Sequence, residues 1–372
     1  MDDIITTMSK IKLVENSFEL EGVVDALSKS DWIGIDTEFL REKTYYPLLC
    51  LIQVHSDLGE WCVDTVKIDD LSSFEEVLSN SALCKIFHSC RQDLEALERR
   101  FSKPVQNLYD TQIAAGFSGL GDQVSYAALV KEVSGIELAK TQTRTDWSAR
   151  PLSSLQIDYA IDDVRYLDDI RQHVNSRLNE LGRIEWHRAE CQRILDNVDY
   201  IVDAKEAWSR LKGAAKIPRQ NQQAAKALAI WREFRAQKRD RPREWIVPTR
   251  AIIEISTKRP RDMRALSSIE GMSPGIVRNA GNDILEILDD HPPDFDADAI
   301  WSRHEPMDNA QKAKLKQAMK QLRAIAEREN ISQSLLANRS DVQAMILQSR
   351  DVDLMRGWRY ELAGKAIMEV LN

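Results

Sequence analysis

Short apolar runs alternate with amphipathic stretches along the first 110 residues of the chain. Residues 32–36, 48–54, 61–63 and 85–87 are short and largely apolar, which predicts buried strands. Helical spacing of apolar positions within 71–78 predicts a helix between the last two strands. This alternation indicates a mixed α/β domain.

Beyond about residue 110 the strand pattern fades and helical periodicity replaces it. Residues 123–131, 153–182 and 186–211 show this periodicity with few helix-breaking residues, so the first domain should end in long helices. Glycine and proline then occur close together at 212–218, which predicts a linker.

Two helical modules of similar size are predicted after this linker. Pro242 interrupts the first module, and Pro292-Pro293 marks its end. We therefore expect domains at 1–211, 218–292 and 307–372. The predicted helices are 221–238, 252–256, 263–266 and 274–288 in the first module, and 310–329, 338–349 and 357–371 in the second.

The composition is typical of a soluble globular protein, with 43% hydrophobic and 30% charged residues. No apolar run approaches the 18 residues of a membrane-spanning helix. The first ten residues are acidic and polar, whereas a signal peptide begins basic and then becomes apolar. We expect a cytoplasmic protein with no membrane partner.

The cysteines indicate reduced thiols in a core. There are five of them, an odd number, and they show no CxxC or Cys/His spacing. That pattern fits neither a disulfide framework nor a zinc site. We therefore expect no zinc.

The net charge of −8 hides an uneven distribution. As an average it argues against nucleic-acid binding. Residues 205–261, however, contain 16 Lys and Arg against 5 Asp and Glu. This segment could be an ordinary solvated face or a phosphate-binding surface, and the second interpretation depends on whether the front of the chain acts on nucleic acid.

Two carboxylates, Asp36 and Glu38, close the first apolar run. Residues i and i+2 of a strand share a face, so both side chains would lie together at its carboxyl end. Like charges a few ångströms apart raise each other's pKa unless a cation neutralises them. The pair is therefore a candidate metal site.

Two further segments can bring carboxylates to the same place. Asp93 is expected in the first turn of the helix after strand 85–87, pointing back toward the strand ends. Tyr159 and Asp163 are four residues apart on a predicted helix and share a face, whereas Asp162 points elsewhere. All-oxygen ligands suit Mg²⁺ or Mn²⁺, and two such ions roughly 4 Å apart can promote phosphodiester hydrolysis.

The motifs of the front domain, in their order, resemble those of the bacterial ribonuclease D family. This family belongs to the DEDD 3′–5′ exonucleases, and Tyr159 indicates the subgroup with tyrosine in the third motif. The resemblance implies a ribonuclease H-like α/β exonuclease domain. The segments that carry it are 34–39, 41–47, Gln53, 88–94, 110–112, 144–152 and 159–167.

The helical part of the chain extends this resemblance. Residues 222–290, with Trp231 and Ile269-Glu270-Gly271, are similar to the HRDC domain. Residues 308–372 have the size and position of a second, more divergent HRDC-like module. The implied fold class is an α/β ribonuclease H-like exonuclease domain followed by two all-α HRDC-type domains, in a monomer.

The resemblance also implies a mechanism. Asp36, Glu38, Asp93 and Asp163 would bind two Mg²⁺ or Mn²⁺ ions, and Tyr159 would orient the attacking water. A phenol with an ordinary pKa of about 10 is a poor base at neutral pH, so metal activation would supply the deprotonation. The substrates would be tRNA precursors and other small structured RNAs with free 3′ ends, and the products nucleoside 5′-monophosphates.

Candidates for substrate contact lie in two places. Thr37 and Phe39 flank the metal ligands and could contact the terminal nucleotide through backbone and stacking, although core packing explains Phe39 as well. Arg144, Trp147 and Arg150 lie in a polar loop where cations and an indole could steer a strand end. Packing explains Trp147 equally well.

Two other functions stay open from the sequence. A 3′–5′ exonuclease of the same superfamily could act on DNA, because nothing in the predicted site visibly reads a 2′-hydroxyl. A non-catalytic RNA-binding scaffold could keep the fold without hydrolysis, although all four carboxylates and the tyrosine are present. A comparison of the degradation of RNA and DNA substrates would distinguish the DNA exonuclease from the exoribonuclease.

Overall fold

The chain divides into two compact units rather than three serial domains. The computed structural model describes residues 12–138, 145–197, 203–301, 307–347, 349 and 351–371. Unit 1 consists of Met1–Leu40, Leu49–Val198 and Met307–Asn372, and unit 2 of Arg41–Leu48 and Asp199–Pro306. The C-terminal block, which we expected to be a separate domain, therefore belongs to the same unit as the front domain.

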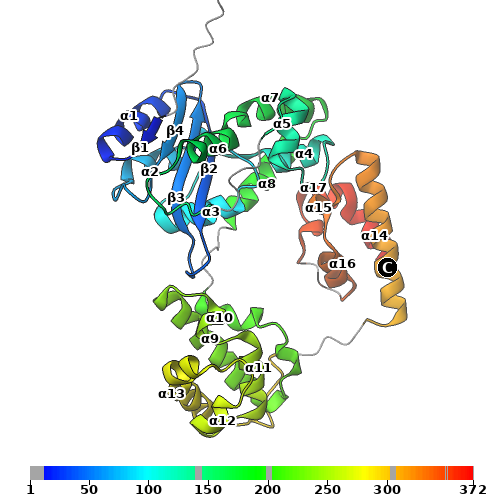
Figure 1. Cartoon of the computed structure of the whole chain (residues 1–372). Helices are drawn as coiled ribbons and strands as arrows, with labels where there is room; N and C mark the ends of the chain where they lie inside the picture. The colour runs from blue at the N-terminus through cyan, green and yellow to red at the C-terminus, as the bar shows by residue number, and fades with distance from the viewer. Residues whose placement is uncertain are drawn as a thin grey trace, which may run out of the picture. The chain divides into compact units, whose positions relative to one another are not determined.

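A six-stranded mixed sheet forms the centre of unit 1 (Figure 1). Its strand order is β1-β4-β3-β2-β5-β6, with β1 parallel to β4, β5 parallel to both β2 and β6, and β3 antiparallel to β4. The strands are β1 (Lys12–Val14), β2 (Trp32–Leu40), β3 (Leu48–Ser56), β4 (Gly59–Val63), β5 (Cys84–Phe87) and β6 (Leu108–Asp110).

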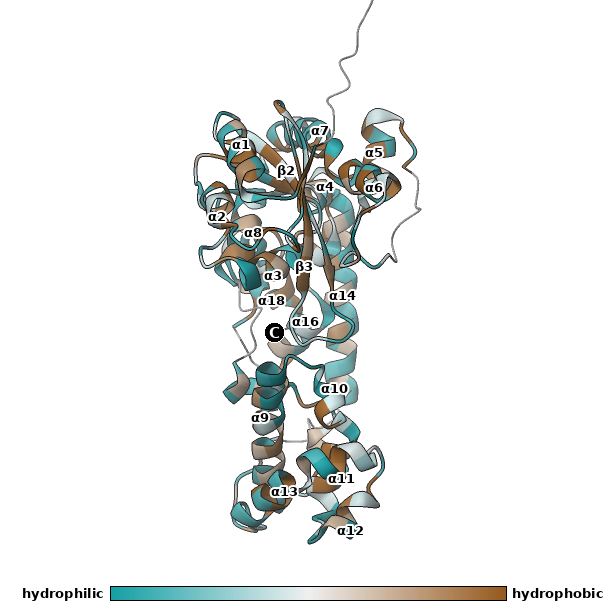
Figure 2. Cartoon of the chain, turned by 60° about the vertical axis from the view of Figure 1, so that its left-hand side comes forward, coloured by the Kyte–Doolittle hydropathy of each residue, from teal (hydrophilic) through white to brown (hydrophobic). Residues whose placement is uncertain are grey.

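The apolar runs predict the inner strands of this sheet correctly. β3 is buried along most of its length and is coloured as hydrophobic in Figure 2, as expected for a strand near the middle of the sheet. The edge strands β1 and β6 are missing from the prediction. Each has three residues, which is too short to show a period.

The helices of unit 1 differ from the prediction mainly at their ends. The helix predicted at 153–182 is two helices that meet at Tyr166, and the one predicted at 186–211 ends at Asp196. The helices before the C-terminal block are α1 (Ser17–Leu27), α2 (Ser72–Ser79), α3 (Arg91–Arg100), α4 (Thr111–Ser118), α5 (Tyr126–Ser134), α6 (Ser154–Arg165), α7 (Leu167–Glu180) and α8 (Ile184–Asp196).

The C-terminal block packs against α4 and α8. Trp358 stacks on Trp186 with ring centroids 5.1 Å apart, and its edge meets Phe117 at 5.0 Å. Gly116 allows close approach, because a Cβ there would lie 2.9 Å from Leu335 Cδ1. The block contains α14 (Asn309–Glu329), α15 (Gln333–Leu336), α16 (Arg339–Ile346), η4 (Asp353–Met355), α17 (Gly357–Arg359), η5 (Tyr360–Gly364) and α18 (Lys365–Leu371).

Unit 2 is helical, and its core begins earlier than the sequence predicts. Leu211, Ala214 and Ile217 are buried in that core, so 212–218 is a packed part of the unit and not a linker. The unit contains η1 (Ala204–Arg210), η2 (Ala214–Lys216), η3 (Arg219–Asn221), α9 (Gln222–Arg239), α10 (Arg243–Ile246), α11 (Thr249–Lys258), α12 (Met263–Ser267) and α13 (Pro274–Asp290).

Residues 41–47 connect β2 to β3, and together with Leu48, the first residue of β3, they belong to unit 2. The side chain of Tyr45 is buried in the unit 2 core, and its hydroxyl donates a hydrogen bond to Glu233. The backbone N–H groups of Tyr45 and Tyr46 donate to Asp240 Oδ1 at 2.9 and 3.0 Å. The core of unit 2 is therefore assembled from two separate stretches of the chain.

All five cysteines lie among the described residues, and none forms a disulfide. Across the described ranges, every helix is too short or too polar to cross a membrane.

Removing Arg359 should weaken the packing of the C-terminal block against α8. Its guanidinium holds both carboxylate oxygens of Glu190, which is only 3% exposed, and donates to Leu335 O at 2.7 Å. Arg359→Ala leaves that buried carboxylate with Arg193 as its remaining partner, so we expect a loss of about 3 kcal/mol in the free energy of unfolding, measured in urea.

The matched control, Arg188, lies on α8, the helix that carries Glu190. Arg188 pairs with Glu185 on the exposed surface of α8, so Arg188→Ala should change the unfolding free energy very little. Equal effects of the two substitutions would show that the Glu190–Arg359 pair does not hold the block.

Candidate active site

Three carboxylates from two elements converge in unit 1. Asp36 and Glu38 lie two residues apart on β2, and Asp163 lies in the last turn of α6. One oxygen from each carboxylate lies within 4.8 Å of the others. The strand pair and the helical aspartate singled out in the sequence therefore form one cluster.

Gly34 allows α6 to approach β2 this closely. A Cβ at position 34 would lie 3.1 Å from Val164 O and 3.2 Å from Leu167 Cδ1, closer than nearly all real contacts. Any larger residue would push the chain around Val164 away from the strand. The glycine of the first motif thus brings Asp163 to Asp36.

Asp93, on α3, lies beside the cluster but is not one of the three carboxylates within 4.8 Å of one another, and its charge helps to raise the pKa of Asp36 and Glu38. It is 7% exposed, in the first turn of the helix, and its Oδ1 accepts a hydrogen bond of 2.6 Å from Thr37 Oγ1. Asp110 fixes the turn before α3, because its carboxylate accepts from the N–H groups of Ser89 and Cys90 at 3.2 and 2.8 Å. Asp110 is a positioning residue, and it is also the N-cap of α4.

The hydroxyl of Tyr126 divides the helix predicted at 153–182. It donates to Asp162 O at 2.9 Å and accepts from the N–H of Tyr166 at 3.2 Å. These are the two groups that an uninterrupted helix would pair, so the phenol is inserted into the helical hydrogen-bond ladder. α6 consequently ends at Arg165, two residues after Asp163.

Tyr159 and Asp163 share a face of α6, as the four-residue spacing predicts. The phenol hydrogen-bonds the Asp163 carboxylate. Asp162 turns away and pairs with Arg165, whose Nε also donates to Glu60 at 2.7 Å. The expectation that Asp162 points elsewhere is therefore confirmed.

The carboxylates hold their protons unusually well. Burial, and then the neighbouring carboxylates, raise the pKa of Asp36 well above its usual value and the pKa of Glu38 to about 8. Burial also raises the pKa of Asp93 and Asp163 to about 7, against hydrogen bonds that lower it. Four acids that repel each other's charge in a desolvated site favour a bound cation.

The donor set fits a hard divalent ion. Every candidate ligand atom in the Asp36, Glu38 and Asp163 cluster is a carboxylate oxygen. Oxygen ligands suit Mg²⁺ or Mn²⁺. The carboxylate of Asp93 accepts a hydrogen bond from Thr37, the residue between Asp36 and Glu38 on β2.

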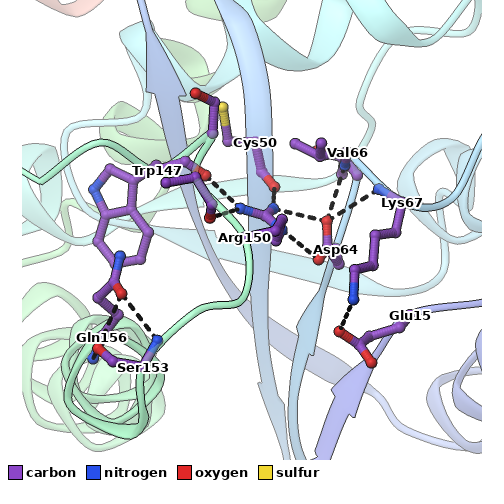
Figure 3. Close-up of polar contacts among 12 residues, drawn as sticks. Glu15, Cys50, Asp64, Val66, Lys67, Trp147, Arg150, Ser153 and Gln156 are labelled. Atoms are coloured by element: carbon purple, nitrogen blue, oxygen red, sulfur yellow. Dashed lines mark hydrogen bonds and ion pairs between the residues drawn. The ribbon is translucent and has the colours of Figure 1, made fainter.

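Arg150 has a structural role in place of the substrate contact expected from the sequence (Figure 3). Its Nε and Nη2 donate to the two oxygens of Asp64 at 2.6 and 2.7 Å, and Nη2 also donates to Cys50 O at 2.9 Å. Nη1 donates to the carbonyl oxygens of Trp147 and Ala149 at 2.6 and 2.9 Å. All its N–H donors are thus engaged, and a phosphate would have to break these bonds.

The other four expected contacts have different outcomes. Trp147 is 3% exposed and packs against Tyr159 with ring centroids 6.3 Å apart, which fits the packing alternative. Thr37 is 5% exposed, and its hydroxyl is bonded to Asp93, so that side chain positions a ligand. Phe39 is half-buried at the end of β2, and Arg144 lies outside the described residues.

The fold and the cluster define the chain as an exonuclease joined to an HRDC domain. Residues 11–179 match the family model described as 3′-5′ exonuclease, and residues 221–288 match the HRDC domain. The second of the two expected HRDC-type domains, in the C-terminal block, stays a prediction.

Full-length relatives identify the family. The chain is 32% identical to ribonuclease D of Granulibacter bethesdensis over 97% of its length and 92% of the relative's. It is 34% identical to ribonuclease D of Sphingobium indicum, over 97% and 94% of the two chains. The chain therefore belongs to the ribonuclease D family of 3′–5′ exoribonucleases, whose exonuclease domain implies dependence on divalent metal ions.

A solved structure shares this architecture. RNase D of Escherichia coli, an exoribonuclease involved in structured RNA processing, superimposes with a TM-score of 0.89 at 26% identity. The match covers 97% of this chain and 98% of the other. The C-terminal block is thus included in the shared fold.

Removing the Tyr126 hydroxyl should impair turnover without touching a metal ligand. In Tyr126→Phe the Asp162 carbonyl and the Tyr166 N–H can pair with each other, which would extend α6 and move Asp163. We expect kcat on RNA to fall about tenfold with little change in KM. Tyr360→Phe, in the C-terminal block, is the matched control, and equal kcat values for the two variants would contradict this role.

The metal-free protein should lose stability as pH rises. Unfolded carboxyl groups titrate near pH 4, whereas Glu38, Asp93 and Asp163 titrate near pH 7–8 when folded. The folded state therefore holds more protons between about pH 4 and 8, and its stability falls across that window.

Thermal unfolding in EDTA and in Mn²⁺, at pH 6 and pH 8, measures this effect. Tm in EDTA should be lower at pH 8, and the gain on adding Mn²⁺ should be larger there, because less proton competes with the ion. A Tm gain that is independent of pH would contradict proton–metal competition at this cluster.

Proposed function

We propose that the chain trims the 3′ ends of tRNA precursors and other small structured RNAs, releasing nucleoside 5′-monophosphates. The observation that carries the proposal is the carboxylate cluster, with oxygens of Asp36, Glu38 and Asp163 within 4.8 Å and the Tyr159 phenol bonded to Asp163. An all-carboxylate site with a hydrogen-bonding phenol suits hydrolysis of a phosphodiester.

Asp36, Glu38, Asp93 and Asp163 would hold two ions, Mg²⁺ or Mn²⁺, and zinc is not expected at such a ligand set. When bound, the ions supply an activated water and stabilise the departing 3′ oxygen. Thr37 fixes one carboxylate by its 2.6 Å hydrogen bond, so the ligand geometry is held before substrate arrives.

Tyr159 would orient the attacking water rather than deprotonate it. Burial and the nearby carboxylates of Asp163, Glu38 and Asp36 raise the pKa of this phenol far above neutrality. It therefore keeps its proton and can act only as a hydrogen-bonding group at working pH. Trp147 packs against its ring and limits the positions it can adopt.

Phe39 and Arg144 remain proposed contacts of the terminal nucleotide. The basic segment 205–261 would bind the phosphates of the RNA body, a surface that suits structured RNA because it reads shape rather than sequence. We also propose that the enzyme works as a monomer in the cytoplasm, where its five free cysteines would stay reduced.

Release of 5′-mononucleotides from a tRNA precursor with a 3′ trailer tests the proposal. We expect Asp36→Asn to abolish release and Tyr159→Phe to lower kcat about a hundredfold with a smaller change in KM. Asp158→Asn, an exposed aspartate on α6, makes the same charge change away from the cluster and should leave release intact.

The other outcomes identify the two alternatives. Equal or faster degradation of single-stranded DNA would show a DNA exonuclease. Binding of RNA without metal-dependent release would show a scaffold.

A further inference from the structure

A cavity of about 510 Å³ lies within unit 2, between residues 41–48 and the helical part of that unit. Five of its twelve lining residues are arginine or lysine and two are glutamate, so its walls carry a net positive charge. The volume is in the range of sites that bind small ligands. None of these residues belongs to the carboxylate cluster.

Arg232 lines this cavity and carries a buried guanidinium. The residue is 6% exposed, and its Nη1 donates to Val247 O and Thr249 Oγ1, both at 3.0 Å. Its Nε has no hydrogen-bond partner among the described residues. Its paired carboxylate, Glu244, lies 3.6 Å away and is itself exposed. Two neutral oxygens and an exposed carboxylate compensate the charge of this buried guanidinium only in part, and an anion in the cavity would add a countercharge.

Exposed cations complete the anion-binding character of the cavity. Arg210 and Lys212 line it from the chain before α9, and both are exposed. Arg243 lines it as well, lies over the Tyr45 ring at 5.4 Å and pairs with Glu233 at 3.2 Å. One anionic group in the cavity would thus meet the buried guanidinium of Arg232 and the exposed cations together.

Trp245 adds a flat apolar wall. Its side chain is 53% exposed, and the Arg241 guanidinium lies 6.0 Å from its ring. The same tryptophan also lines a second cavity of about 240 Å³, with Arg235 and Arg239. An exposed indole between two basic cavities is suited to stack one base while phosphates lie on either side.

We propose that this cavity binds a nucleotide of single-stranded RNA, with its phosphate facing Arg232 and Lys212 and its base stacked on Trp245. The inference rests on the proposed action on RNA and assigns one contact of the substrate upstream of its 3′ end. An acidic peptide would satisfy the cations but would leave the indole without a planar partner.

Affinity for a fluorescently labelled single-stranded RNA of about 12 nucleotides, measured by anisotropy in EDTA, tests the stacking contact. Trp245→Ala should weaken binding about tenfold and raise KM more than it lowers kcat. Trp245→Phe keeps an aromatic face and should restore most of the affinity. Phe234→Ala removes another aromatic residue of unit 2, 49% exposed and outside both cavities, and should bind like wild type.

The salt dependence of RNA affinity tests the proposed contact between Lys212 and the phosphate. Lys212→Gln should lower the slope of log affinity against log salt by about one, whereas Lys320→Gln, at an exposed lysine on α14 outside both the cavity and the basic segment 205–261, should not.

The results separate failure of the cavity from failure of the function. If wild type trims RNA but Trp245→Ala binds like Phe234→Ala, the cavity inference is wrong. If Trp245→Ala weakens RNA binding while wild type releases no nucleotide, the cavity stands and the proposed function fails. Displacement of RNA by polyglutamate, with Trp245→Ala lowering affinity for neither ligand, would assign the cavity to an acidic polypeptide instead.

Discussion

Mutual repulsion among four carboxylates is the constraint on which the rest of unit 1 depends. Asp36, Glu38, Asp93 and Asp163 come from three elements, and in isolation each would move away from the others or take up a proton. Neutral features hold them together: a missing side chain at Gly34, a hydroxyl at Thr37 and a phenol at Tyr126. Packing and hydrogen bonds thus maintain a geometry that charge alone would disperse.

Local patterns in the sequence were enough to predict which carboxylates of β2 and α6 come together, but not the residues that support them. The two-residue spacing of Asp36 and Glu38 and the four-residue spacing of Tyr159 and Asp163 fix shared faces without knowledge of the fold. No spacing pattern in the sequence indicates that Arg150 pairs with Asp64. Only the tertiary structure shows that Asp64, 86 positions earlier, occupies its guanidinium.

The same limit explains the errors in the helical regions. The apolar period through 153–182 is continuous, and the break comes from the Tyr126 hydroxyl, which is distant in sequence. Residues 212–218 have the glycine and proline of a linker, yet Leu211, Ala214 and Ile217 are spaced to bury one face. Glycine and proline indicate where a chain can turn, whereas the burial of a segment depends on which other parts of the chain pack against it.

Residues 41–48 limit how a gene of this kind can be recombined. A breakpoint after Val198 would transfer the helices of unit 2 without Tyr45, leaving Glu233 without the hydroxyl that it binds. The recipient would also need backbone N–H groups at positions 45 and 46 that donate to the Asp240 carboxylate. Unit 2 is therefore encoded in two separate stretches of the gene. A recombination that preserves the unit must transfer the eight residues Arg41–Leu48 together with its helices.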